Sequence, residues 1–226
     1  MGDPRRSPPE SIRRVMISPA VSALADAALL LPAAMLVLLI LGALRQGRLF
    51  LAFATALGAA AVTTLVLKLF FHACGHAIVT EVRVLSPSGH VAFGTAFYGA
   101  LAIMLAAGRG RSVRLLAWLA TVLLLFAVGV SRVRTGAHSS AEVVIGFAVG
   151  GAALGLFGVL HGWAGRPRLP WLPFGAGFSL ALLLLWGSHF SLEGEIARYA
   201  RRMAAVLDVC SPPERIGGGR FSSGLH

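Results

Sequence analysis

The sequence predicts an all-α, polytopic membrane protein with about six transmembrane helices. Of its 226 residues, 57% are hydrophobic and only 13% are charged, whereas a soluble domain carries about 25% charged residues. The apolar residues also form long blocks, each close to the roughly 20 residues that a helix needs to cross a bilayer. These blocks lie at residues 21–44, 49–71, 91–107, 113–130, 139–160 and 171–187.

The segments that flank these blocks are polar. Residues 1–20 form an arm rich in proline and arginine, and no cleavable signal peptide is evident, because the apolar block that follows is too long. Pro32 predicts a kink in the first helix, or a boundary between an interfacial helix and the true span. Residues 191–210 suit an amphipathic interfacial helix, with a loosely ordered soluble helix as the alternative. Residues 211–226 are rich in proline, glycine and serine and are expected to be disordered.

The basic residues favour a membrane setting over nucleic acid. The net charge is +11, and Lys68 is the only lysine among 20 basic residues. The arginines occur in short clusters between apolar blocks, as membrane-flanking anchors do. Since no contiguous basic face or RNA-binding motif is present, we expect no nucleic-acid partner.

A first polar motif, Ser-Pro-Ser-Gly-His at residues 86–90, precedes the third apolar block. Ser88 is a good helix cap, and Gly89 allows close backbone approach. The N–H groups at a helix N-terminus attract anions, phosphate above all, and His90 is placed to donate a proton there. The alternative is a plain helix cap with an interfacial histidine.

A second polar motif runs from Ser131 and Arg132 to His138 and Glu142. The i, i+4 spacing lets the carboxylate reach the imidazole, fixing its tautomer and leaving the other ring nitrogen free to attack. Arg132 offers a planar fork that matches phosphate oxygens. The alternative is a juxtamembrane arginine cluster with a structural His–Glu pair.

Glycines extend the face of the fifth block that carries this motif. Gly146 and Gly150 continue the four-residue spacing of His138 and Glu142, and Gly151 and Gly155 repeat it alongside. Because glycines let helix backbones approach closely in lipid, we expect this face to pack into the bundle.

Together with Lys68, near the end of the second block, these motifs resemble the type 2 phosphatidic acid phosphatase superfamily. The family pattern has Lys, six residues and Arg-Pro; then Pro-Ser-Gly-His; then Ser-Arg, five residues, His, three residues and Asp. Residues 87–90 match the second part, and residues 131–142 match the third with Glu142 in place of Asp. The first part is broken, because Gly75-His76 stands where Arg-Pro is expected. His76, Arg83 and Arg134 are the candidates to replace that arginine.

The resemblance implies a phosphatidic-acid-phosphatase-type bundle over residues 21–190 that hydrolyses a lipid phosphate or an isoprenyl pyrophosphate. His138 would attack phosphorus to form a phosphohistidine, Glu142 would orient it, and His90 would protonate the leaving group and then activate water. Lys68, Ser88, Gly89 and Arg132 would hold the phosphate, with no metal or other cofactor. The alternatives are a weak or silent member that binds lipid phosphate or a partner, and a small transporter, for which no repeat of broken helices is visible.

Two further residue patterns, which involve histidine and cysteine, give weaker indications of a functional role. His72, Cys74 and His76 have a spacing that can bind zinc, but no third ligand pattern accompanies them, so structural or interfacial roles are favoured. Cys74 and Cys210 lack metal-type spacing and are expected to be ordinary structural residues, although on an oxidising face they are able to pair.

Loop charge predicts the side of the membrane. The short loops opposite the motifs and their flanks hold Arg45, Arg48, Arg109, Arg111, Arg114, Arg166 and Arg168. By the positive-inside rule that face is cytoplasmic, so the motifs are expected to be extracytoplasmic, at the inner membrane of a bacterial cell. This places outside, against the rule, the basic residues of both terminal segments: Arg5, Arg6, Arg13, Arg14, Arg198, Arg201 and Arg202.

Overall fold

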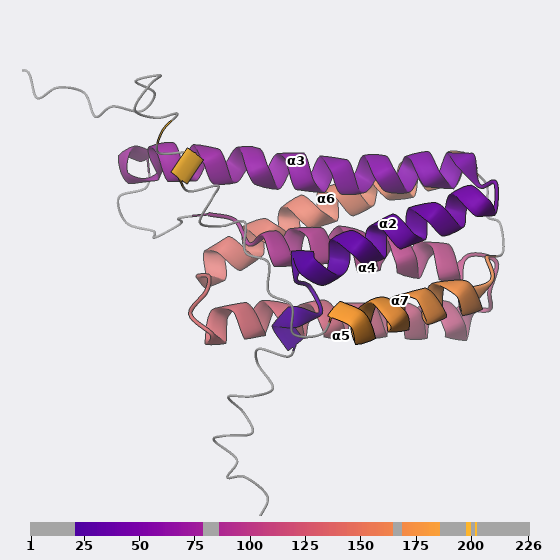
Figure 1. Ribbon diagram of the computed structural model, residues 1–226. Coiled ribbons are helices and arrows are strands. Elements are labelled where there is room, and N and C mark those ends of the chain that lie inside the picture. The colour runs from indigo at the N-terminus through magenta and orange to yellow at the C-terminus, as the bar shows by residue number, and fades with distance from the viewer. Residues whose placement is uncertain (1–20, 79–85, 165–168, 186–197, 200–201, 203–226) are drawn as a thin grey trace, which may run out of the picture.

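A computed structural model describes residues 21–78, 86–164, 169–185, 198–199 and 202. In this part of the chain all regular structure is helical (Figure 1). The helices are α2 (Ala27–Ala43), α3 (Gly47–Ile78), α4 (Gly89–Ala106), α5 (Arg111–Arg134), α6 (Ser140–Ala164) and α7 (Trp171–Leu185). Each predicted apolar block overlaps one of them, which confirms the all-helical membrane fold.

Five segments of the described chain are long and apolar enough to cross a membrane. They are Val21–Ala43, Gly47–His72, Gly89–Ala106, Arg111–Arg134 and Ser140–Gly162. The sixth predicted span corresponds to α7, which is described over 15 residues, up to Leu185, and is not among these five. The chain is therefore an integral membrane protein.

The first apolar block is interrupted near Asp26 and not at Pro32, as one reading of the sequence had expected. Residues 21–25 form a turn of helix, and Asp26 then takes extended backbone angles and caps α2, its Oδ1 accepting the N–H of Ala28 at 2.9 Å. Aspartate is among the best N-cap residues, whereas Pro32 lies inside α2, which continues through it.

The loop that precedes the first polar motif is shorter than the sequence suggested. The apolar block ends at Phe71, but α3 continues to Ile78. The extension contains no proline, the residue that most strongly breaks a helix. It carries the backbone of Cys74 and His76, whose side chains lie outside the described residues.

Other expectations also fall outside the described residues. They are the polar arm at 1–20, Arg83, most of the amphipathic segment 191–210, and the tail 211–226 with Cys210.

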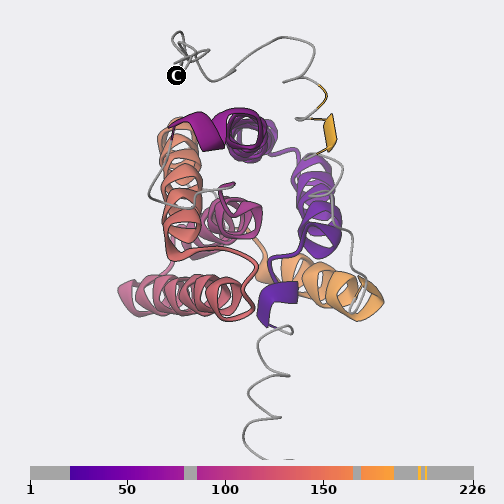
Figure 2. The ribbon, with the colours of Figure 1, turned by 90° about the vertical axis from the view of Figure 1, so that its left-hand side faces the viewer.

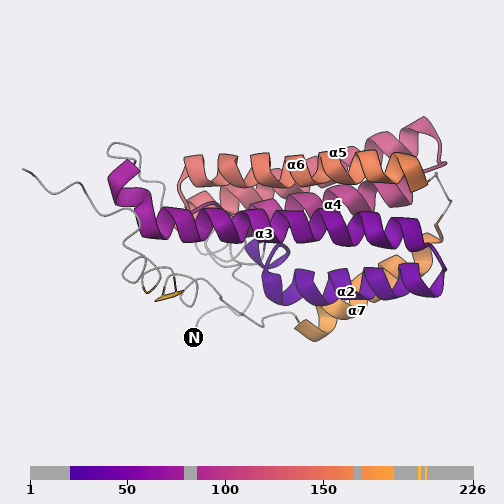
Figure 3. The same ribbon diagram turned by 90° about the horizontal axis from the view of Figure 1, so that it is seen from above.

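α4 is the central helix of the bundle. Seen along the helix axes it is surrounded by α3, α6, α5, α7 and α2 (Figure 2), and it has the largest buried share of the five candidate spans. α2 packs against α7 on one flank, while α5 and α6 lie on the other (Figure 3). Phe53, Phe97 and Phe157, all fully buried, join α3, α4 and α6 by edge and tilted ring contacts.

The predicted glycine face of α6 packs against α4, as expected. A Cβ on Gly146 would lie 2.8 Å from the carbonyl oxygen of Ser88, and one on Gly150 would lie 2.5 Å from that of Ala92. The adjacent glycine row does not share this contact, because a Cβ on Gly151 or Gly155 would meet nothing within 4 Å. The close approach sets the start of α6 directly against the start of α4.

This difference between adjacent glycines is testable. Gly150→Ala is expected to destabilise the bundle by about 1–3 kcal/mol, the usual cost of overpacking a tight core. Gly151→Ala, the matched control, is expected to be neutral or slightly stabilising, because alanine is the better helix former by roughly 1 kcal/mol. Thermal unfolding of both variants in detergent measures the difference, and equal melting temperatures would contradict the α4–α6 packing.

Candidate active site

Both polar motifs lie at one end of the bundle, the left-hand end in Figure 1. There α3 and α5 end and α4 and α6 begin, because the chain reverses direction at each connection. Every described residue that the sequence singled out as catalytic or phosphate-binding belongs to these four helices or to the segments that connect them at this end.

The end of α5 is a Schellman motif that fixes the distance from Arg132 to His138. The N–H of Ala137 donates to the carbonyl of Arg132 (3.2 Å), and the N–H of Gly136 donates to that of Val133 (3.0 Å). Gly136 adopts φ +68°, the left-handed conformation that this cap requires and that glycine adopts without strain. The N–H of His138 also donates to the Arg132 carbonyl, at 3.2 Å. The spacing of arginine and histidine is therefore set by the backbone.

α6 begins with a capping box formed by Ser139 and Glu142. The Ser139 hydroxyl accepts the N–H of Glu142 at 3.3 Å, and the Glu142 carboxylate accepts the N–H of Ser139 at 3.0 Å. This is the Ser-x-x-Glu pattern of a helix start. The pattern is visible in the sequence, although it was not among the predicted features. Glutamate is the acidic residue that this pattern uses at the third helical position, a structural reason for it to stand where the family pattern has aspartate.

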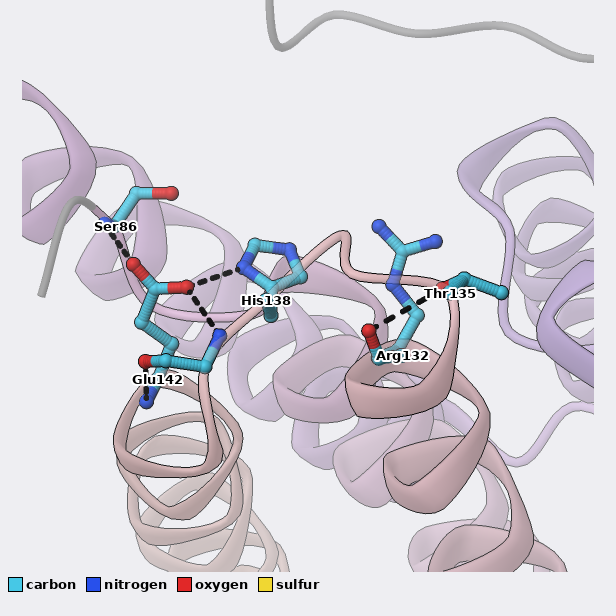
Figure 4. Close-up of polar contacts among 6 residues, drawn as sticks. Ser86, Arg132, Thr135, His138 and Glu142 are labelled. Atoms are coloured by element: carbon cyan, nitrogen blue, oxygen red, sulfur yellow. Dashed lines mark hydrogen bonds and ion pairs between the residues drawn. The ribbon is translucent and has the colours of Figure 1, made fainter. Parts of the chain in front are cut away.

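The Glu142 carboxylate also holds His138 (Figure 4). His138 Nδ1 lies 3.0 Å from Oε2, and the two side chains are only 3% and 6% exposed. The other oxygen, Oε1, accepts the N–H of Ser86 at 2.9 Å across the site. A carboxylate on Nδ1 makes that nitrogen the donor and leaves the lone pair on Nε2. The predicted His–Glu pair is therefore present, and it is tied to the first motif.

The first motif starts α4 beside this pair. Ser88 occupies the N-cap position, and its N–H donates to the backbone carbonyl of Glu142 at 3.1 Å. The expected side-chain cap is absent: the Ser88 hydroxyl makes no cap bond, is fully buried, and has no hydrogen-bond partner among the described residues. Such a group is costly to bury unless a ligand or water satisfies it.

Lys68 lies against Gly89, the first residue of α4. A Cβ on Gly89 would stand 3.6 Å from Lys68 Cε and 4.0 Å from Nζ, so the absence of a side chain gives the lysine its room. Lys68 is buried, although it lies only four residues before the end of the candidate span Gly47–His72. The structure thus brings Lys68 next to the first motif, at the N-terminus of α4.

Arg132 is half-buried and projects past the end of α5 near His138 (Figure 4). Its Nη1 donates to the hydroxyl of Ser22 at 3.1 Å. Arg134, one of three candidates for the missing arginine, is exposed on the same helix end. The side chains of the other two, His76 and Arg83, lie outside the described residues.

His90 pairs with a residue that the sequence analysis did not identify. Its Nε2 lies 3.5 Å from Oδ2 of Asp26, and the side chains are 20% and 17% exposed. Its position in the sequence could have identified Asp26. It is an acidic residue within the first apolar block, at the same membrane face as both motifs.

No group of three or more metal-ligating side chains occurs within the described part of the chain. His72 is half-buried near the end of α3, and the side chains of its proposed companions are not described.

The fold and the site define a class: a helical membrane protein with a buried histidine–carboxylate pair, a second histidine and two basic side chains gathered at one membrane face. The PAP2 superfamily model matches residues 49–166, which is more than half of the chain and spans both motifs. The protein belongs to the PAP2 superfamily. No curated protein and no solved structure gives a significant match. Superfamily membership supports a phosphatase-type activity in general.

Proposed function

We propose that the protein is a membrane phosphatase that hydrolyses a lipid phosphate or an isoprenyl pyrophosphate through a phosphohistidine on His138. The observation that carries the proposal is the buried His138–Glu142 pair, 3.0 Å apart, beside the N-terminus of α4. A histidine whose Nδ1 is held by a carboxylate keeps its Nε2 lone pair for attack. His138 also lies beside the N-terminus of α4, and helix N-termini bind phosphate.

The phosphate cradle is supplied by the residues around that N-terminus. Lys68 and Arg132 bring positive charge, the Ser88 hydroxyl offers a buried donor, and Gly89 contributes the backbone N–H of the first position of α4. Donors fixed in advance around the equatorial oxygens stabilise the transition state of phosphoryl transfer, and each one is worth roughly 10²–10³ in rate. The cradle needs no metal ion to supply charge.

The reaction then has two steps. Nε2 of His138 attacks phosphorus, the bond to the leaving oxygen breaks, and His90 protonates that oxygen. Water next attacks the phosphohistidine, His90 takes its proton, and the bond between phosphorus and Nε2 breaks. Glu142 balances the charge of His138 in both steps.

The experiment that tests this function is phosphate release from dioleoyl phosphatidate and from an isoprenyl pyrophosphate, with the full chain in detergent. Release that persists in excess EDTA supports the proposal. Loss of release on chelation contradicts its metal-free form, and inert protein on both substrates contradicts the proposed function.

A second candidate is a slow or silent member that binds lipid phosphate without turning it over. The observation that favours it is the broken first motif, in which Gly75-His76 replaces Arg-Pro. Inert protein that still binds phosphatidate vesicles more tightly than phosphatidylcholine vesicles would favour this candidate.

We further propose that the site faces the extracytoplasmic side. The opposite end of the bundle carries exposed Arg45, Arg48, Arg111 and Arg114, the arrangement of a cytoplasmic face. If α7 is counted as the sixth crossing, as the sequence predicts, alternation along the spans places the C-terminus on the side of the site. A C-terminal alkaline phosphatase fusion is therefore expected to be active and a C-terminal green fluorescent protein fusion to be dark in a bacterial host; the reverse pattern would overturn the orientation.

A further inference from the structure

The segment between Ser22 and Asp26 lies over the site although it falls outside the part of the chain that matches the family. Polar contacts fasten it to α4 and α5, next to the proposed catalytic residues. They join Ser22 Oγ to Arg132 Nη1 (3.1 Å), the Leu24 carbonyl to the Tyr98 hydroxyl (2.5 Å) and Asp26 Oδ2 to His90 Nε2 (3.5 Å). Ala25 packs beside them, at 3.4 Å from where a Cβ of Gly94 would stand.

The two carboxylate oxygens of Asp26 make different contacts. Oδ1 accepts the N–H of Ala28 and so caps α2, while Oδ2 faces the imidazole of His90. The capping bond fixes the carboxylate in place, so that the second oxygen is presented to His90 without further loss of side-chain freedom. Partial burial of both groups limits the competition from water for this contact.

We propose that Asp26 is a positioning residue for His90, a proposal that rests on the proposed function. By holding Nε2, Asp26 orients the ring and makes Nδ1 the nitrogen that carries the proton to the leaving oxygen and later takes one from water. The two histidines then use opposite nitrogens: Glu142 holds Nδ1 of His138, and Asp26 holds Nε2 of His90.

The sharpest test uses leaving groups that differ in their need for a proton. Asp26→Asn keeps an N-cap residue of equal quality but removes the charge that faces His90. The variant is expected to lower kcat/KM on dioleoyl phosphatidate about 10-fold, part of the roughly 10²–10⁴-fold that a general acid contributes. On p-nitrophenyl phosphate, whose leaving group departs without a proton, kcat/KM is expected to change less than about two-fold, because it reports only the steps up to the phosphoenzyme.

Two further variants distinguish the positioning of His90 from an effect of Asp26 on folding. Asp26→Ser, a cap residue without charge, is expected to behave like Asp26→Asn. Asp26→Glu, which restores the charge, is expected to recover part of the loss on phosphatidate. An equal loss on both substrates would assign Asp26 a merely structural role, and unchanged kcat/KM on phosphatidate would also overturn the proposal.

A second measurement tests the contact without turnover. In protein labelled with ¹⁵N-histidine, with the His90 signals assigned by His90→Asn, Asp26→Asn is expected to shift the ring ¹⁵N signals of His90 and not those of His138. Unshifted His90 signals would overturn the proposal. Wild-type protein that is inert on every phosphate tested would refute the proposed function alone, because this spectrum would still show whether Asp26 orients His90.

Discussion

Replacing His138 by alanine is expected to abolish phosphate release, with kcat lowered by roughly 10⁴-fold or more. The reason is that the proposed reaction passes through a covalent bond from Nε2 to phosphorus, and neither His90 nor water has the Glu142 contact that activates His138. In wild-type protein quenched during turnover of ³²P-labelled phosphatidate, label is expected on the protein and is expected to be acid-labile, as phosphohistidine is. In the variant that label is expected to be absent.

Two control variants make this result specific. His138→Asn keeps a polar group for the buried Glu142 carboxylate and is expected to be equally inactive, which separates loss of the nucleophile from loss of stability. His161→Ala removes another buried histidine of α6, one that stacks on Phe157 towards the other end of the helix. It is expected to retain phosphate release. Full activity in both His138 variants would rule out the phosphohistidine.

Replacing Glu142 by glutamine is expected to lower kcat by on the order of 10²–10⁴-fold, as the loss of an orienting carboxylate does when the histidine is left in the wrong tautomer. Glu142 accepts hydrogen bonds from His138 Nδ1 and from the N–H groups of Ser86 and Ser139. A glutamine has one acceptor oxygen, so its NH₂ group would face at least one of these donors. The free energy of unfolding is therefore expected to fall as well, by about 1–3 kcal/mol.

Glu142→Asp distinguishes the effect of the carboxylate charge from that of the side-chain length. Aspartate keeps the charge and is the residue of the family pattern, but it is one methylene shorter, so it is not expected to satisfy Ser86 and His138 together. We expect activity between that of wild type and that of Glu142→Gln, measured as kcat on phosphatidate alongside the melting temperature. A glutamine variant with wild-type kcat would show that the carboxylate does not act on His138.

Much of the fold was predictable because it follows from the apolar blocks. The helix start at Asp26 was not, since it depends on which residue satisfies the first N–H groups of α2. The two glycine rows of α6 show the same limit. Their spacing is identical, but only Gly146 and Gly150 meet α4, because a sequence repeat does not specify which face of a helix meets its neighbour.

The local parts of the site were predictable and the long-range parts were not. His138 and Glu142 are four residues apart on one helix face, so their contact follows from helix geometry. Lys68 was expected at the same end of the bundle as both motifs, but its contact with Gly89 depends on how α3 packs against α4. Asp26 was missed because no spacing rule relates it to His90, and only the bundle brings the two together.

The cap at the end of α5 constrains how this region of the sequence is able to vary during evolution. The backbone bonds from the Arg132 carbonyl to Ala137 and His138 depend on the number of residues between them and on a glycine at position 136, which adopts φ +68°. Val133 and Arg134 are exposed and do not take part through their side chains. Substitutions there are therefore tolerable, whereas a single insertion or deletion would separate the arginine from the nucleophile.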